Sequence, residues 1–277
     1  MKLGANAGIV GCYTEDRFLK LKEYGFDYFD LGIEGAHPRM TPEEYERYIL
    51  HQKELADAAG VTIWQVHGPW RYPPHDETEE RRAERLALMQ NSLRLTAQIG
   101  CKYWVIHPIM PFGPDDDYDL DLFMKINYDF FQALLPTAKQ YGITICFENM
   151  PMKGLSISTP EATLRFIRSI DDENFKFCLD TGHCSALGIS PAEAVRMAGK
   201  DLKVLHVHDN GGRRDDHFVP LKGVIDWKDF GAALVEIGYD GVYSLECGWK
   251  EFLINASNET KLSCLRAIVD EVLPKEV

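Results

Sequence analysis

The chain has 277 residues and a formal net charge of −13, from 30 lysines and arginines against 43 aspartates and glutamates. This acidic balance argues against nucleic acid or an anionic membrane surface as the main partner, because both require basic protein surface. The length exceeds that of a typical single-core domain, so it indicates either two domains or one barrel-like domain.

Seven cysteines are scattered along the sequence without a paired C-x-x-C motif. We interpret them as buried free thiols of a protein in a reducing compartment. The N-terminus carries no apolar stretch long enough for a signal peptide, and no window approaches a membrane span. We therefore expect a cytoplasmic protein without a membrane partner.

Short apolar runs rich in β-branched and aromatic residues recur along the chain, most of them soon after a glycine. They predict eight strands, at 3–10, 26–31, 61–66, 103–106, 143–147, 175–179, 204–208 and 242–245. Glycines such as Gly60 and Gly142 are typical of helix C-caps, where a left-handed residue ends a helix before the next strand.

Helices are predicted between these strands. Thr41-Pro42 and Ser190-Pro191 each place an N-cap hydroxyl before a proline, with a glutamate completing a capping-box pattern. Thr159-Pro160 resembles them without the full pattern. The stretches 79–98 and 128–140 carry apolar residues at three- and four-residue spacing, so we expect each to bury one face.

Strands that alternate with helices, with no linker rich in Pro, Gly or Ser, indicate one parallel α/β domain over residues 1–277. A doubly wound open sheet is the alternative, but eight units in about 250 residues is the usual size of a (β/α)₈ barrel. A G-x-G-x-x-G motif after the first strand and a Walker-type loop are both absent, so no nucleotide cofactor is expected. We predict a single (β/α)₈ TIM barrel.

Histidines and carboxylates stand at or beyond the C-terminal ends of the predicted strands, where barrel enzymes place their chemistry. A single histidine among apolar residues is more often a hydrogen-bonded core residue, but burying this many titratable groups is costly unless they pair or bind a cation. Mixed imidazole and carboxylate ligands favour zinc or manganese, with cobalt or magnesium as alternatives. The candidate residues are His67, His107, Glu148, Asp180, His183, His206, His208, Asp215, His217 and Glu246.

Four segments resemble the xylose isomerase-like TIM barrels: Glu148-Asn149, 179–183 (LDTGH), 206–209 (HVHD) and Asp226-Trp227, with a glutamate closing the eighth strand. That superfamily contains sugar phosphate isomerases and epimerases, ketose 3-epimerases, inosose dehydratases and endonuclease IV. The resemblance covers all eight units and is specific to the superfamily, but it does not select one reaction.

The ketose 3-epimerases of the superfamily hold one metal ion. The ligands that the resemblance implies here are Glu148, Asp180, His206 and Glu246. His206 is preferred to His208 because the family ligand lies three residues before an acidic residue, here Asp209, and His208 stays a possible substitute. The family's substrate-contacting histidine is matched by His183.

Endonuclease IV raises a competing interpretation, because its three-zinc site has nine ligands that all have counterparts here. They are His67, His107, Glu148, Asp180, His183, His206, Asp215, His217 and Glu246. The number of metal ions, from one to three, therefore stays open. The basic loops expected of a nuclease that grips DNA are not evident, and the net charge disfavours them.

Loop residues near the predicted barrel mouth are candidates for substrate binding. Trp70 and Trp249 could stack on the apolar face of a sugar or serve as packing residues. Arg71 and Arg213 could hold a phosphate or carboxylate or stay solvated. The loop after the seventh strand departs from the family's Pro-Gly-x-Gly, since this chain has Leu221 in place of the first glycine, and the expected epimerase arginine falls at Gly212.

Our leading hypothesis is a metal-dependent isomerase or epimerase of a sugar, sugar phosphate or keto-polyol, acting through a metal-stabilised enediolate. Glu148 and Glu246 would serve as base and acid on the two faces of the substrate, and His183 would orient a substrate oxygen. The alternatives are a multi-zinc phosphodiesterase, a related dehydratase and a non-catalytic sugar-binding protein. Such barrels often form dimers or tetramers, and nothing in the sequence selects among these.

Overall fold

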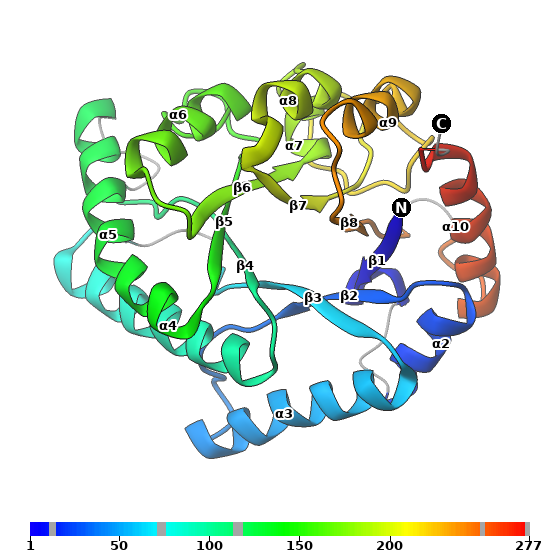
Figure 1. Cartoon of the computed structure of the whole chain (residues 1–277), viewed down its shortest axis with the longest axis horizontal. Coiled ribbons are helices and arrows are strands. Elements are labelled where there is room, and N and C mark those ends of the chain that lie inside the picture. The colour runs from blue at the N-terminus through cyan, green and yellow to red at the C-terminus, as the bar shows by residue number, and fades with distance from the viewer. Residues whose placement is uncertain (11–14, 71–75, 113–118, 250–252, 275–277) are drawn as a thin grey trace.

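The computed structural model describes residues 1–10, 15–70, 76–112, 119–249 and 253–274. Its centre is a cylinder of parallel strands ringed by helices, viewed close to the barrel axis in Figure 1. The strands lie in the order β7-β6-β5-β4-β3-β2-β1-β8. The cylinder closes beyond β7, where Val207 bridges to Leu245 and its carbonyl accepts from the Glu246 amide. The predicted (β/α)₈ barrel is confirmed.

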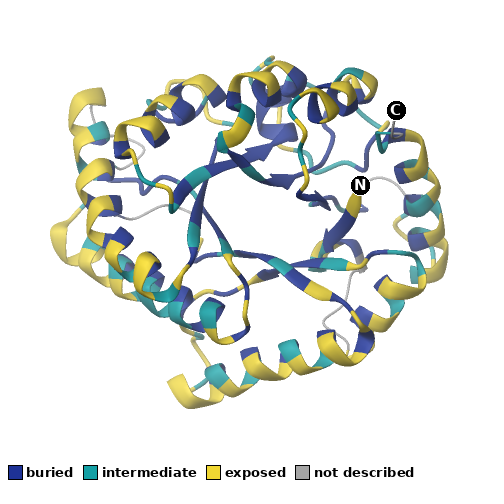
Figure 2. Cartoon of the chain, viewed as in Figure 1, coloured by how far each residue is buried: buried dark blue, intermediate teal, exposed yellow. Residues whose placement is uncertain are grey.

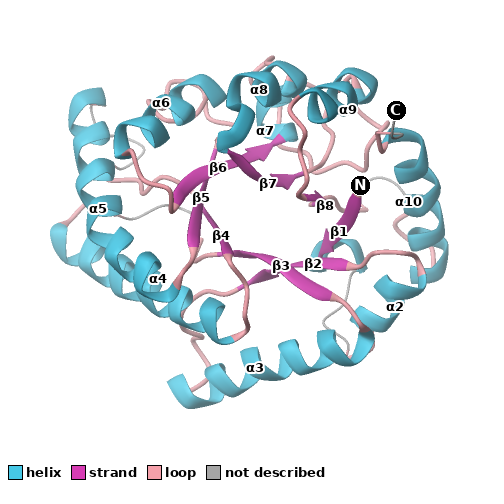
Figure 3. Ribbon diagram, viewed as in Figure 1, coloured by secondary structure: helices cyan, strands magenta, loops and turns pink. Residues whose placement is uncertain are grey.

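Strands and helices alternate along the described chain (Figure 3). The strands are β1 (Lys2–Asn6), β2 (Tyr28–Gly32), β3 (Thr62–His67), β4 (Tyr103–Ile106), β5 (Thr144–Glu148), β6 (Phe175–Asp180), β7 (Leu202–His206) and β8 (Val242–Leu245). The helices are α1 (Ala7–Val10), α2 (Arg17–Glu23), α3 (Pro42–Ala59), α4 (Glu79–Gln98), α5 (Leu120–Tyr141), α6 (Pro160–Ile170), α7 (Thr181–Ala186), α8 (Pro191–Ala198), α9 (Trp227–Glu236) and α10 (Asn258–Val272), with a 3₁₀ turn at Gly199–Asp201.

The helix boundaries follow the predicted capping signals. Thr41 forms a full capping box with Glu44, and Gly60 ends α3 in a left-handed conformation with φ 67°. Thr159 and Ser190 cap α6 and α8 through their hydroxyls. The capping patterns therefore placed these three helix starts correctly.

Two predicted elements differ most from the structure in their bounds. The first strand ends at Asn6, so the prediction of a strand through residue 10 was wrong: the Asn6 side chain accepts from the Gly8 amide at 3.0 Å and turns the chain into α1. The helix predicted at 128–140 is the C-terminal part of α5, which begins earlier because Asp119 caps the amide of Leu122.

Alternation along the strands sorts side chains between the layer under the helices and the barrel interior. The rings of Phe147 and Phe175 lie 4.9 and 5.5 Å from Phe131 of α5 and anchor β5 and β6 beneath the helices. Inside the barrel, Cys146 and Cys178 pack with valines of β4 and β7. Figure 2 shows buried strands inside a ring of helices with exposed outer faces. This packing fixes the strand ends on which the candidate site is built.

The cysteines that the structure describes are all free thiols, and Cys264 is the only one of these that is not fully buried. This agrees with the predicted free thiols, while Cys12 lies outside the described residues. Among the described helices, none combines the length and the hydropathy that a membrane span requires.

Candidate metal centre

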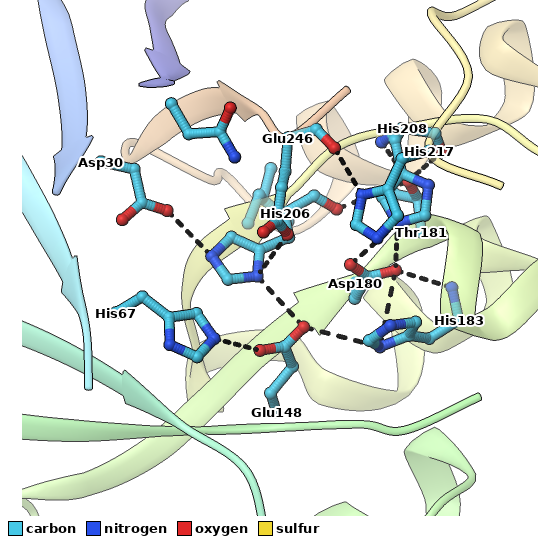
Figure 4. Close-up of polar contacts among 12 residues, drawn as sticks. Asp30, His67, Glu148, Asp180, Thr181, His183, His206, His208, His217 and Glu246 are labelled. Carbon is cyan, nitrogen blue, oxygen red and sulfur yellow. Dashed lines mark hydrogen bonds and ion pairs between the residues drawn. The ribbon is translucent and has the colours of Figure 1, made fainter. Parts of the chain in front are cut away.

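Four of the predicted ligands meet at one end of the barrel. Glu148, Asp180 and His206 are the last residues of β5, β6 and β7, and Glu246 directly follows β8. Parallel strands end on the same side of a barrel, so these side chains converge. One donor atom from each lies within 4.8 Å of the others. Figure 4 shows these four side chains pointing toward one another.

His206 is the centre of this group. Its Nδ1 lies 3.0 Å from Glu148 Oε1 and 3.0 Å from Glu246 Oε2. Its Nε2 lies 2.9 Å from a carboxylate that the sequence analysis did not single out, Asp30 of β2. The ring of His206 is fully buried, so both of its nitrogens depend on protein groups for partners.

Asp180 is held in position from several sides. It is the N-cap of α7, and its Oδ1 accepts from the His183 amide at 2.6 Å. The side chain of Asn149 accepts from the Asp180 amide and donates to its carbonyl, at 2.9 and 3.1 Å. The Nε2 of His208 lies 3.0 Å from the carboxylate. The local sequence DTGH therefore places both Asp180 and His183 through one short helix.

Two further histidines approach Glu148 from the neighbouring strands. The Nε2 of His107 lies 3.1 Å from Glu148 Oε2, and that of His67 lies 3.7 Å from the same oxygen. The two imidazoles are 3.3 Å apart at their Nε2 atoms. These three residues form a second group that could hold a metal ion.

The loop after β7 supplies a third group. Asp215 Oδ2 lies 3.1 Å from His217 Nε2 and 3.4 Å from His183 Nε2. His208 stacks on His217 with ring centroids 4.1 Å apart, and its Nε2 lies 3.5 Å from Asp215 Oδ1. All ten histidines and carboxylates predicted from the strand ends thus lie in one continuous cluster.

Backbone carbonyls fix four of the histidine rings, and the Nδ1–H of His208 donates to the Asp209 carbonyl at 3.3 Å. The Nδ1–H groups of His67, His183 and His217 donate to the carbonyls of Gly68, Asn149 and Glu246, at 2.9, 2.7 and 2.8 Å. A proton held on Nδ1 leaves Nε2 facing the cluster, where its lone pair can bind a cation once Nε2 is deprotonated. This arrangement is typical of metal-ligating histidines, whose second nitrogen is bonded to a carbonyl or a carboxylate.

Charge pairing dominates the protonation of the cluster. Burial raises the pKa of the Glu148 and Glu246 carboxyls, but the surrounding imidazoles together outweigh it. His206 and His107 leave the pKa of Glu148 well below its usual value, and His206 and His217 lower that of Glu246 to about 2. Burial lowers the pKa of His183 and His217, but Asp180 and Asp215 raise these values to about 10 and about 9. For His107, burial prevails and the pKa is lowered.

A cavity of about 460 Å³ opens onto the cluster. Its wall includes Trp70, which is 53% exposed, and Glu34, whose Oε2 accepts from the Trp70 amide at 3.2 Å. Nine of the wall residues were not predicted from the sequence, among them Asp30, Glu34, Met150 and Met152. Asp30 had a detectable signal, because it is a charged residue in the middle of an otherwise apolar strand.

The remaining predicted substrate-binding residues lie away from this cavity or outside the described part of the chain. Trp249 is 8% exposed, and its indole N–H donates to the Ile9 carbonyl at 2.6 Å. Arg213 is exposed, and neither residue is part of the cavity wall. Arg71 lies outside the described residues. No lysine or arginine lines the cavity among the residues that the structure describes.

The architecture defines a class of protein: (β/α)₈ barrels with imidazoles and carboxylates gathered at the strand ends. The model of the family "Xylose isomerase-like TIM barrel" matches residues 18–267, and the chain belongs to this family.

Similar proteins include an uncharacterised protein of Methanocaldococcus jannaschii, 30% identical over 82% of this chain and 76% of that protein. A D-psicose 3-epimerase of Ruminiclostridium cellulolyticum is 25% identical over 82% of this chain and 75% of its own. Among solved structures, a D-tagatose 3-epimerase-like protein has 26% identity and a TM-score of 0.79, covering 98% of both chains.

Proposed function

We propose that this protein is a divalent-metal-dependent isomerase or epimerase of a sugar, sugar phosphate or keto-polyol. The observation that carries the proposal is the convergence of Glu148, Asp180, His206 and Glu246 within 4.8 Å beside a cavity of about 460 Å³. The similarity to a psicose 3-epimerase and to a tagatose 3-epimerase-like structure supports the same class of substrate.

The donor set fits a divalent cation. Three carboxylates and one imidazole supply the oxygen and nitrogen ligands that zinc and manganese accept, and cobalt or magnesium are alternatives. Glu148 and Asp180 are almost fully buried, at 1% and 0% exposure. Buried carboxylates in this number need a compensating positive charge. In this proposal Glu148, Asp180, His206 and Glu246 hold the cation.

The reaction requires removal and return of a proton next to a carbonyl group. A bound divalent cation would act as a Lewis acid that polarises the carbonyl and stabilises the negative charge developing there. Glu148 and Glu246 are both ionised, because their pKa values are depressed, so either can accept the substrate proton. The other would take a proton from solvent water and return it to the opposite face. His183, with its raised pKa, would donate a hydrogen bond to a substrate oxygen.

The four candidate substrate-binding residues differ in how well their positions support that role. Trp70 stands half-exposed on the cavity wall, where its ring could stack on the apolar face of a sugar. Arg71 and Arg213 stay candidates for holding a phosphate or carboxylate. Trp249 donates its N–H to the protein interior, so we propose for it a role in supporting α1 rather than in contacting substrate.

Proton exchange tests the reaction directly. The metal-loaded protein is incubated in deuterated water with a panel of ketoses and keto-polyols, and NMR follows deuterium incorporation at carbon. Removal of a general acid or base costs about 10²- to 10⁴-fold in rate, so we expect this loss for Glu148→Gln and Glu246→Gln. Glu161→Gln, on the exposed side of α6, is the matched control. Wild-type exchange rates in both site variants would refute the acid–base assignment.

A multi-zinc phosphodiesterase is the second candidate, because the cluster forms further potential metal groups around His67, His107 and Glu148 and around His208, Asp215 and His217. Metal analysis separates the two functions, since the phosphodiesterase needs two or three ions per chain. Cleavage of abasic DNA, measured in parallel, would favour it. A dehydratase would use the same site as the epimerase and is recognised by a product that is lighter than the substrate by one water molecule.

The remaining predictions concern the whole protein. The free thiols fit the reducing compartment predicted from the sequence, so a cytoplasmic location stays part of the proposal. A single domain over residues 1–277 predicts one cooperative unfolding transition. Light scattering would measure the oligomeric state, for which a homo-oligomer is one proposal.

A further inference from the structure

Asp30 is a carboxylate inside the barrel whose role the proposed reaction does not explain. It lies in β2, is 5% exposed and forms part of the cavity wall. Its Oδ2 lies 2.9 Å from His206 Nε2 and accepts from the Gln65 side chain at 2.9 Å. Gln65 also donates to the carbonyl of Leu205 at 3.2 Å. Residues of β2 and β3 therefore hold the end of β7 from across the barrel (Figure 4).

A buried acid with a purely local structural role is usually satisfied on both oxygens. Asp209 is such an acid in this protein, because it accepts from three backbone amides and from the indole of Trp227. Asp30 differs: its Oδ1 is buried and has no hydrogen-bond partner among the described residues. The contacts that Asp30 does make are with His206 and with the glutamine beside it.

His206 also differs from the other histidines of the cluster. His67, His183 and His217 are each fixed by a backbone carbonyl at Nδ1, which turns Nε2 toward the cluster. In His206 the two nitrogens have the opposite orientation, because Nδ1 faces Glu148 and Glu246 while Nε2 faces Asp30. At His206 the Asp30 carboxylate therefore takes the position that a backbone carbonyl has at His67, His183 and His217.

We propose that Asp30 is a positioning residue of the metal centre, which holds the proton of His206 on Nε2 so that Nδ1 presents its lone pair to the cation. A neutral imidazole carries its proton on one nitrogen, and the partner of that nitrogen decides which one binds metal. A carboxylate partner also makes the ligating nitrogen more basic than a carbonyl partner does. The inference rests on the proposed metal dependence.

Metal affinity tests this role without measuring turnover. Zinc is titrated into the metal-free folded protein against a competing chelator. Loss of such a partner costs about 10- to 100-fold in metal affinity, which is the weakening we expect for Asp30→Ala. Asp30→Asn keeps an oxygen that can accept from Nε2–H but removes the charge, so we expect a smaller loss.

Asp76→Asn is the matched control for the loss of a buried carboxylate. Asp76 is 1% exposed, accepts from the Met110 amide at 3.2 Å and does not belong to any of the candidate metal-ligand groups. We expect this variant to lower thermal stability and to leave the zinc affinity of the folded protein unchanged.

Spectroscopy separates positioning from general destabilisation. The visible absorption of the cobalt-loaded protein reports ligand geometry, and ¹⁵N NMR of the zinc-loaded protein reports which nitrogen of His206 carries the proton. We expect both signals to change in Asp30→Ala and to stay as in wild type in Asp76→Asn.

The outcomes distinguish this inference from the proposed function. Absence of metal binding in the wild-type protein would overturn both. Wild-type zinc affinity and an unchanged cobalt spectrum in Asp30→Ala would overturn the role of Asp30 alone and leave the metal centre in place. Should Asp30→Ala fail to fold, wild-type affinity in Asp30→Asn together with an unshifted His206 ¹⁵N spectrum would also overturn it.

Discussion

At the scale of single residues, Leu221 has a backbone conformation that its residue type disfavours. Its φ is 70°, and the Lys222 amide donates to the Val219 carbonyl at 3.3 Å around Pro220. Proline followed by a residue with positive φ is the pattern of a type II turn, in which the third position favours glycine. The xylose isomerase-like family that the sequence resembles usually has a glycine at this position. Leu221 thus retains the turn at an energetic cost.

We predict that Leu221→Gly is more stable than Leu221→Ala by about 1 kcal/mol, because glycine adopts a positive φ without steric cost. The alanine variant is the appropriate reference, since the leucine side chain is 56% exposed and contributes little burial. Chemical denaturation measures the difference. Equal stabilities would mean that the turn imposes no strain.

Gly182 is required for a different reason, which is space. A Cβ atom there would lie 1.9 Å from Cε1 of His208, a fully buried ring stacked on His217. We predict that Gly182→Ala costs about 1–3 kcal/mol of stability, the usual cost of overpacking. It should also weaken metal binding, because His208 contacts Asp180. Gly248→Ala, where a Cβ meets nothing within 4 Å, is the control and should change neither quantity.

At the scale of elements, the loop from β7 to α9 is organised by one carboxylate. Asp209 accepts from the amides of Asn210, Gly223 and Ile225 and from the indole of Trp227, at 2.9 to 3.3 Å. The same residue pairs with Phe218 in an antiparallel bridge. The segment between these contacts carries two members of the third metal-ligand group. Asp209, which lies three residues after His206, therefore holds the loop in place.

Replacing either of two aspartates of this loop should lower stability by different amounts. Asp209→Ala leaves several buried donors without an acceptor, and we expect a loss of more than about 3 kcal/mol in unfolding free energy. Asp226→Ala removes only the N-cap of α9, worth about 1 kcal/mol. Urea denaturation compares them. Similar losses in both variants would contradict the central role of Asp209 in the loop.

At the scale of the whole molecule, the acidic net charge is concentrated in part at the barrel mouth. Glu148, Asp180, Asp215 and Glu246 belong to the candidate metal groups and face one another across a few ångströms. Without a cation, protonated histidines balance these charges. Metal binding then releases protons from His206 and its neighbours, which links metal affinity to pH.

As far as His183, His217 and Glu246 are concerned, the metal-free protein should therefore be most stable between about pH 4.5 and 6.5. His183 and His217 have pKa values raised from 6.5 to about 10 and about 9, so their contribution is complete below pH 6.5 and is lost as the pH rises through these values. Glu246 has a pKa lowered from 4.5 to about 2, so its contribution is lost as the pH falls from 4.5 toward 2.

Thermal unfolding in the presence of a chelator, measured from pH 3 to 10, tests this dependence. His217→Gln removes one of the titrating groups and should flatten the alkaline decline in melting temperature. A wild-type alkaline decline in this variant would show that His217 is not linked to stability. Added zinc should raise the melting temperature most at alkaline pH, where the histidines have lost their protons.

The sequence was sufficient for the elements and for the ends of the strands. Alternation and capping signals are local, so the eight strands, the starts of α3, α6 and α8 and the inward direction of Glu148, Asp180 and His206 could all be predicted from neighbouring residues. The shape of the first strand could not, because a single side-chain bond from Asn6 to the Gly8 amide ends it.

Only the tertiary structure decided the contacts between residues that lie far apart in the chain. Asp30 meets His206 across 176 residues, and Trp249 turns to the Ile9 carbonyl across 240. Neither contact has a local pattern, since both depend on how β2, β7 and β8 are brought together when the barrel closes. The sequence by itself therefore determined that the ten predicted histidines and carboxylates reach the barrel mouth. Barrel closure, with its register and side-chain packing, decided which of them hold one another.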